Sequence, residues 1–203
     1  MNTASRTAVG MPLSAVLQKA FELGVSDARI ISAQSIVVED RFVEMCSMPQ
    51  CPGYGLSPNC PPHTMKSADF RDLLTHYTYA LVFKFDVPTE ILLNDSQLDV
   101  AKLIHEISAD LERLAKENGY THSRGLAAGS CKMIFCKEHE KCSVLDKNED
   151  CRFPDKARPS LSGVGVNFLE LCKTLGWQFE KITKDTKHDD VPMGIMAGMV
   201  LIG

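Results

Sequence analysis

The stretch YALVFKFDV, residues 79–87, is the clearest strand signal in the chain. Apolar and aromatic residues dominate it, which is typical of a strand that contributes to a core. Other β-like runs lie before and after it, at residues 28–33, 35–45, 123–130, 177–183 and 194–202. We therefore expect residues 79–87 to belong to a sheet, although the pattern does not give the strand order.

Helical patterns alternate with these runs. We expect helices at residues 12–23, at 65–76, from about 96 to 119, and at 160–175. Gly119 suits the left-handed position that follows a helix, and Ser160 suits an N-cap. The alternation predicts an α/β or α+β fold. We expect a single domain over residues 1–203, with a mixed sheet covered by helices.

Length and charge exclude several classes of protein. The 203 residues suit one domain that buries its own core. The formal net charge is -4 and no aromatic-basic platform is visible, so we expect no nucleic-acid partner. The N-terminal segment lacks the continuous apolar stretch of a signal peptide, and the apolar run at 193–203 is too short to span a bilayer. We expect a cytoplasmic protein without a membrane partner.

Eight cysteines are the unusual feature of the composition, and seven of them form two groups. The first group is Cys46-x4-Cys51-x8-Cys60, and the second is Cys131-x4-Cys136-x5-Cys142-x8-Cys151. In a reducing compartment such groups favour metal ligands over disulfides. We therefore expect two long cysteine-rich metal-binding loops, at about residues 46–63 and 131–154.

The spacing favours iron-sulfur clusters and leaves zinc as the alternative. Structural zinc sites use cysteines two to four residues apart, and the chain has no Cys-x2-Cys pair. Iron-sulfur clusters tolerate wider spacing, and Cys-x4-Cys occurs in plant-type ferredoxins. The second group has enough cysteines for one [4Fe-4S] cluster. The first group has three, which leaves one metal position open, and His63 is a candidate ligand for it.

The two groups lie in different surroundings. Residues 45–62 carry no charged side chain, and an uncharged shell excludes water from a metal and tunes its potential. The second segment carries both signs of charge. Cations such as Lys132 and Arg152 can offset the negative charge of a thiolate-bound cluster, although each charged residue can equally be a solvated loop residue.

Three residues outside the two groups are also candidates. Cys172 lies beside Leu171 on the predicted helix 160–175, and we expect it to be a core residue. Arg158 and Ser160 flank the start of that helix, where an anion can bind. They are candidate cofactor-binding residues, and a plain helix cap is the alternative for Ser160.

Three motifs carry a resemblance to a known family: CPGYGLSPNCPP (51–62), AGSCKMIFC (128–136) and CRFPDKARPSLSGVGV (151–166). In these motifs the sequence resembles the Domain of Unknown Function 2284 family, a cysteine-rich group of prokaryotic, predicted metal-binding proteins. The resemblance covers roughly residues 30–180. It implies a bound metal, iron-sulfur above all, in anaerobe-rich prokaryotes, and it implies no particular reaction. The chain departs from the family at Pro58-Asn59, where an aromatic residue usually precedes the next cysteine.

The sequence therefore predicts an iron-sulfur protein with one or two [4Fe-4S] clusters and an electron-transfer or reductive role. A redox partner protein is expected, and the pattern does not decide between an oxidoreductase and its electron-transfer component. Two alternatives stay open. One is a zinc protein whose cysteine segments are structural and whose function is protein binding, and the other is a carrier of metal or clusters.

Overall fold

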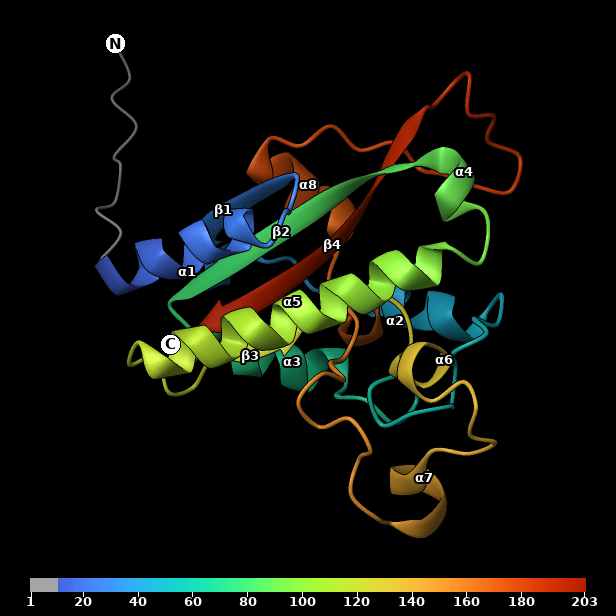
Figure 1. The fold of residues 1–203 in the computed structure, drawn as a ribbon, viewed down its shortest axis with the longest axis horizontal. Helices are drawn as coiled ribbons and strands as arrows, with labels where there is room; N and C mark the ends of the chain where they lie inside the picture. The colour runs from blue at the N-terminus through green and yellow to red at the C-terminus, as the bar shows by residue number, and fades with distance from the viewer. Residues whose placement is uncertain (1–10) are drawn as a thin grey trace.

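A computed structural model describes residues 11–203 of the chain. Its centre is a sheet of four strands: β1 (Asp27–Ser32), β2 (Tyr79–Pro88), β3 (Arg124–Leu126) and β4 (Met193–Ile202). The strands lie in the order β1-β2-β4-β3, and all three neighbouring pairs are antiparallel. The strand predicted at 79–87 is β2, one of the two inner strands (Figure 1).

Strand β2 is apolar along most of its length because both faces of the sheet are covered. Leu81 and Phe83 face one core, whereas Ala80 and Val82 face the other, and all four side chains are fully buried. Side chains alternate between the two faces of a strand. A strand covered on one face only would therefore show a polar residue at every second position.

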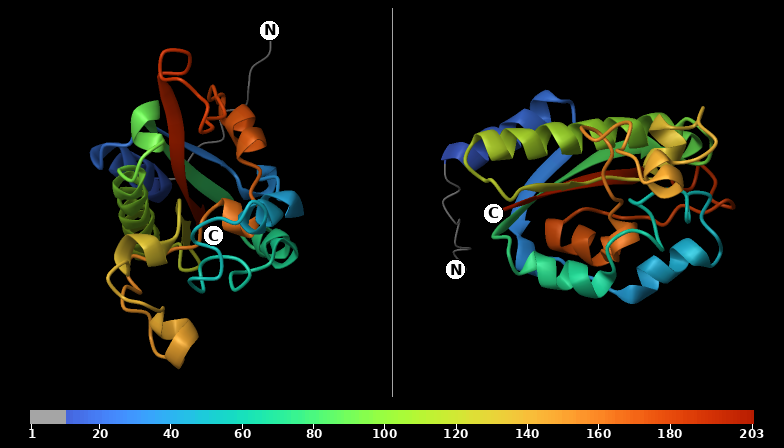
Figure 2. Two further views of the ribbon diagram at one scale, coloured as in Figure 1. Left: turned by 90° about the vertical axis from the view of Figure 1, so that its right-hand side faces the viewer. Right: turned by 90° about the horizontal axis from the view of Figure 1, so that it is seen from below.

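Helices α1 (Met11–Glu22) and α5 (Gln97–Glu117) cover the first of these faces (Figure 2). Leu13 and Val16 of α1 are fully buried there, at the spacing of an amphipathic helix. Helix α5 ends where the sequence predicts, because Gly119 adopts a φ of 96° just after its last turn.

Helices α3 (Ser67–Leu74) and α8 (Phe168–Leu175) cover the opposite face. Phe70 of α3 and Leu171 of α8 are buried in this second core. Cys172 is buried among the same apolar side chains, as expected, and burial raises the pKa of its thiol to about 11. It is therefore a core residue by its surroundings.

The remaining elements are short. They are η1 (Ala33–Ser35), α2 (Asp40–Ser47), α4 (Thr89–Leu92), α6 (Cys131–Phe135), α7 (Ser143–Lys147) and η2 (Ser162–Val164). Helices α2 and α6 lie at the same end of the molecule, and α7 protrudes beside them (Figures 1 and 2). Cysteines lie on or next to all three helices, so the predicted cysteine-rich loops are partly helical.

Two predicted strands are wrong, and the sheet is antiparallel rather than mixed. Residues 35–45 contain the end of η1 and most of α2, and within the described part of the chain their only strand-like contact is a single bridge from Val38 to Val166. Residues 177–183 form no strand either. Trp177 instead donates a hydrogen bond from its indole nitrogen to Asp27, at 2.9 Å, which directs this segment across the end of β1.

The helix predicted at 160–175 begins only at Phe168. Gly165 adopts a φ of 88°, a left-handed conformation that interrupts a helical path. Asn167 is the true N-cap, and its side-chain oxygen accepts a hydrogen bond from the amide of Glu170 at 3.1 Å. Ser160 caps a shorter turn, because its hydroxyl accepts a hydrogen bond from the amide of Gly163 at 3.1 Å.

The single sheet and its two cores agree with the predicted fold class. The part of the predicted domain before residue 11 lies outside the described residues. None of the helices in the described chain is long and apolar enough to cross a membrane. The longest, α5, is amphipathic, as its place along the sheet requires.

Candidate metal centre

The four cysteines of the second group line one small, partly enclosed cavity. Short elements bring them together: Cys131 is the first residue of α6, Cys136 ends that helix, and Cys142 is the residue before α7. Cys151 returns from beyond α7 to the same cavity. The four residues between Cys131 and Cys136 thus belong to the short helix α6, and the eight residues between Cys142 and Cys151 include α7.

The rest of the cavity wall suits a soft, anionic group. Among the described residues the wall has no carboxylate, and hard cations such as magnesium and calcium prefer oxygen ligands. Phe135 and Phe153 stack with their ring centroids 5.5 Å apart and close part of the wall. Lys132 and Arg152 bring positive charge to it. Metal-bound thiolates match this environment in both softness and charge.

Lys132 is the most informative of these charged side chains. It is only 9% exposed, and its ammonium donates hydrogen bonds to the carbonyl oxygens of Cys136, at 3.0 Å, and His139, at 2.6 Å. Within residues 11–203 no carboxylate forms an ion pair with it. A buried charge without a counter-ion is costly. Four metal-bound thiolates would supply the missing negative charge.

Burial raises the pKa of the Cys131 and Cys136 thiols. At Cys136 the guanidinium of Arg152 opposes this effect, because a positive charge beside the sulfur favours the thiolate. Thiols with a raised pKa are protonated and unreactive at neutral pH, and a metal ion displaces their protons when it binds. The surroundings therefore favour metal ligation over nucleophilic chemistry.

The first group is more open than the second. Cys46 lies on α2, Cys51 is exposed, and Cys60 is buried. The amide of Cys51 donates a hydrogen bond to the carbonyl of Cys46 at 2.9 Å, which folds the chain back between them. Burial raises the pKa of Cys46, and the negative charges of nearby Cys51 and Cys60 raise it further. The three side chains are thus near neighbours.

Two hydrogen bonds between side chains join the segments that carry the two cysteine groups. The thiol of Cys60 donates to the hydroxyl of Ser130 at 3.3 Å, and the side-chain amide of Asn59 donates to the sulfur of Cys131 at 3.5 Å. Each segment therefore contacts the other beside a cysteine. The fit is close, because a methyl group on Gly53 would lie 2.5 Å from the Cβ of Ser130. The seven cysteines occupy one continuous region.

The other candidates from the sequence have different surroundings. His63 is exposed, and its backbone amide donates a hydrogen bond to the carbonyl of Cys60 at 3.0 Å. Arg158 forms a partly buried ion pair with Glu112, with 2.7 Å between Nε and Oε2. Ser160 lines a different cavity from Arg158. Anion binding by the two side chains together stays a prediction, as does ligation by His63.

The four thiols of the second group are suitable metal ligands by their chemistry, but they lie too close together to enclose an iron-sulfur cubane without movement of the chain. In the described part of the chain no three His, Cys, Asp or Glu side chains are arranged to hold a single metal ion. The cavity between the four thiols has a volume of about 20 Å³. A cubane cluster is larger than this, so the segments around Cys142 and Cys151 would move outward to bind one.

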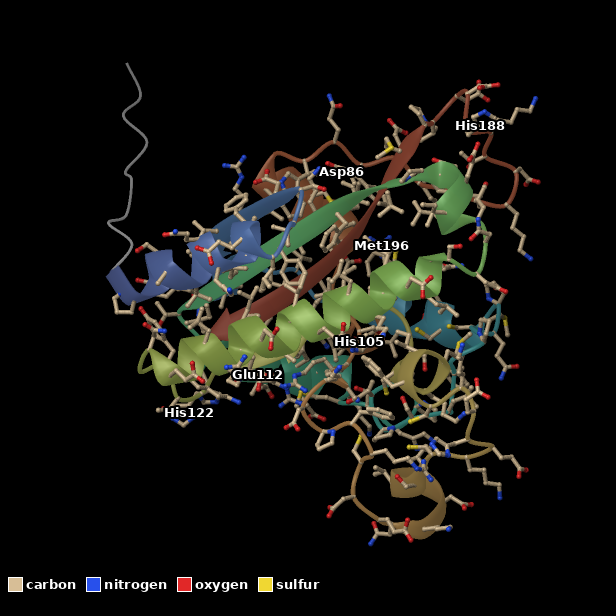
Figure 3. All side chains as sticks on the ribbon, in the orientation of Figure 1. Asp86, His105, Glu112, His122, His188 and Met196 are labelled. Carbon is tan, nitrogen blue, oxygen red and sulfur yellow. The ribbon has the colours of Figure 1, made fainter. Side chains whose placement is uncertain are left out.

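His105 is a buried polar residue that no motif reveals. It projects from α5 with no exposed surface (Figure 3), and its ring meets Phe135 edge-on at 5.4 Å. Its Nδ1 accepts a hydrogen bond from the amide of Arg158 at 3.1 Å, and its Nε2 lies near the carbonyl of Ala128 without a well-formed hydrogen bond. Burial lowers its pKa to about 4. Only its position on the buried face of α5 could have indicated it.

Comparison with known proteins identifies the family. The family described as "Predicted metal-binding protein (DUF2284)" matches residues 29–202. The chain belongs to this family. The match includes all eight cysteines, and it confirms the family that the three sequence motifs predict. No curated protein and no solved structure matches the chain. The DUF2284 description supports metal binding and names neither the metal nor a reaction.

Proposed function

We propose that this DUF2284 protein is an iron-sulfur redox protein. Cys131, Cys136, Cys142 and Cys151 hold one [4Fe-4S] cluster in this proposal. The observation that carries it is the small four-thiol cavity, whose wall contains two cations and, among residues 11–203, no carboxylate. Four thiolates are the usual ligands of such a cluster. The wide spacing and the lack of a Cys-x2-Cys pair favour iron-sulfur over zinc.

The proposed role of the first group is a second, more accessible centre. Cys46, Cys51 and Cys60 provide three ligands and leave one position for water, a substrate or a side chain. Cys51 is exposed, so a partner can reach this group, whereas no cysteine of the second group is fully exposed. The contacts between Asn59 and Cys131 and between Cys60 and Ser130 make a short connection through the protein.

Electron transfer, or a reductive step at the open position, follows from this arrangement. An iron-sulfur cluster, when bound, supplies one-electron chemistry. The chain's own residues position the two groups side by side and surround the inner one with Phe135, Phe153 and Lys132. We further propose a redox partner protein and a cytoplasmic location, supported by eight free thiols in the described chain.

A zinc-binding structural protein is the second candidate, and one observation favours it. The cavity of about 20 Å³ between the four thiols is closer to the space that a single ion needs than to that of a cubane. Zinc-sulfur bonds of about 2.3 Å would draw the four sulfurs together rather than apart. In this case the cysteine segments would stabilise the fold and the surface would bind other proteins.

Replacement of Cys142 tests the four-cysteine site. We expect Cys142→Ser to remove about one cluster's worth of metal and to destabilise the segment around α7, because metal binding and local folding are coupled. Cys172→Ser is the matched control, since Cys172 is buried in the core, and its metal content should stay at the wild-type level. Metal and acid-labile sulfide are measured on protein purified without oxygen. Full metal content in Cys142→Ser would show that the four-cysteine assignment is wrong.

A further inference from the structure

A second cavity, which is widely open to solvent, lies where β3 leaves the sheet. Strand β3 pairs with β4 as far as Leu126, and the next residue, Ala127, pairs instead with Ser160. The space between these diverging backbones and β4 has a volume of about 250 Å³. It is lined by residues 127–129, 160–162 and 195–197, together with Phe42, Val166 and Phe168. This is slightly below the range of drug-sized pockets and suits a small molecule.

The segments that form this cavity lie next to the first cysteine group, although none of its three cysteines lines the cavity. Phe42 and Cys46 lie one turn apart on the same face of α2. Ser130, which follows the wall segment 127–129, contacts the thiol of Cys60. Gly163 follows the wall segment 160–162, and a methyl group on it would lie 3.4 Å from Pro61, the residue after Cys60. The cavity and the three-cysteine group therefore adjoin each other.

The cavity wall carries no charged side chain among the described residues. Its apolar residues include Phe42, Phe168 and Met196, the last of which lies on β4 (Figure 3). A charged ligand would lose part of its hydration here without gaining a counter-charge. A neutral ring would gain free energy from burial of its apolar surface. The wall thus selects uncharged, apolar molecules.

Two hydroxyl residues, Ser160 and Ser162, interrupt this apolar wall, and Ser160 is the buried one of the two. It is 8% exposed, and its oxygen accepts the hydrogen bond from Gly163. Its hydroxyl proton has no acceptor within residues 11–203. A hydroxyl can accept and donate at once, so Ser160 can maintain its turn and still donate to a ligand.

We propose that this cavity binds a small uncharged molecule with an apolar ring and one hydrogen-bond acceptor, such as a carbonyl oxygen, which Ser160 holds. The ligand would lie beside the three-cysteine group and would be the substrate class for its open position. Binding itself is independent of the metal, whereas the role as substrate rests on the proposed function.

Three fluorinated probes of one ring size test the binding site by ¹⁹F NMR titration of the full chain, purified without oxygen. They are 4-fluoroacetophenone, which is neutral with an acceptor, fluorobenzene, which has no acceptor, and 4-fluorobenzoate, which is charged. We expect the ketone to bind about tenfold more tightly than the benzoate and several-fold more tightly than fluorobenzene. Equal affinities for the three probes would overturn the proposal.

Four variants connect the binding to named residues. Ser160→Ala should reduce the affinity for the ketone to that for fluorobenzene, and Ser160→Thr should restore it, because threonine keeps both the turn and the donor. Phe168→Ala should bind both neutral probes weakly. Phe179→Ala is its control, since Phe179 contacts the ring of Phe168 edge-on but does not line the cavity. Wild-type affinity for the ketone in Ser160→Ala and Phe168→Ala would contradict the assignment.

Reduction of the sample separates this proposal from the proposed function. If iron occupies the first cysteine group, the bound fluorine signal should broaden on reduction because a paramagnetic centre lies close to it. If metal analysis finds zinc alone, the proposed function fails. The relative affinities of the three probes still test whether the cavity binds the proposed ligand class. In protein with two iron clusters, an unchanged line width would place the ring far from the three-cysteine group and overturn the substrate role.

Discussion

His105 shows how a single buried residue makes stability depend on pH. Burial lowers its folded-state pKa to about 4, whereas an unfolded histidine has a pKa of about 6.5. Between these two values the unfolded chain binds a proton that the folded chain does not. The contribution to stability is therefore fully present above about pH 6.5 and is lost as the pH falls toward 4.

His105→Asn should remove this pH dependence. Asparagine keeps an acceptor for the amide of Arg158 and does not titrate. From pH 7 to pH 5 we expect the wild-type protein to lose about 2 kcal/mol more unfolding free energy than the variant. Urea denaturation at the two pH values measures the difference. The exposed His122, changed to Asn, should behave like the wild type. An equal loss in wild type and His105→Asn would contradict the burial argument.

Lys132 should set the charge balance of the second cysteine group. Lys132→Met keeps most of the apolar volume and removes a buried positive charge. Reduction of a bound cluster adds negative charge, so its midpoint potential should fall, on the order of 50 mV for one charge at an effective dielectric constant near 20. Redox titration followed by electron paramagnetic resonance measures this shift. Lys147→Met, at an exposed position, should leave the potential unchanged. Equal potentials in both variants would exclude this role.

At the residue scale, the sequence identifies the candidate metal-ligand cysteines but not the side chains that contact them. The seven grouped cysteines and the core position of Cys172 can be read from spacing and helical pattern. The contacts of Lys132 with two carbonyls, of Asn59 with Cys131 and of His105 with Phe135 cannot, because each depends on how separate segments meet. A lysine in a charged segment looks like a solvated residue until the fold buries it.

At the scale of elements, the contact between the two cysteine segments depends on a small residue. Gly53 does not adopt a positive φ, and a methyl group on it would meet the Cβ of Ser130 at 2.5 Å. Gly53→Ala should therefore destabilise the protein by about 1–3 kcal/mol, as overpacking does, and should lower the metal content of the first group.

A double-mutant cycle isolates this contact. Ser130→Gly removes the Cβ that the methyl group added at position 53 would strike, so Gly53→Ala should cost much less in the Ser130→Gly background than alone. Thermal unfolding and metal analysis of the four proteins give the coupling. Additive effects of the two substitutions would mean that the segments do not meet at these residues.

Elements with strong periodic patterns are predictable, and those held by distant contacts are not. Strand β2 and helix α5 follow from apolar periodicity and from Gly119. Residues 35–45 form a β-like run in the sequence, yet Arg71 of α3 donates hydrogen bonds to Val38 and Asp40 at the start of α2, and these contacts favour a helix. The helix predicted from Ser160 fails because the stronger cap, Asn167, follows the left-handed Gly165.

At the scale of the whole molecule, the chain brings two cysteine groups from distant parts of the sequence into one region. The fold class and the family are predictable, because composition, alternation and three motifs are local properties of the sequence. The adjacency of the two groups is not, since it depends on the docking of residues 51–61 against residues 130–131. The cavity beside β3 is equally a product of topology, where one strand leaves its partner.

Metal and sulfide analysis of anaerobically purified protein tests the central claim most directly. Iron, zinc and acid-labile sulfide are counted per chain, and a visible spectrum is recorded on the same sample. Two [4Fe-4S] clusters predict about eight irons and about eight sulfides with a brown colour. About four of each would confine iron to the four-cysteine group. One or two zinc ions with no sulfide would contradict the redox account and leave a structural, zinc-bound protein.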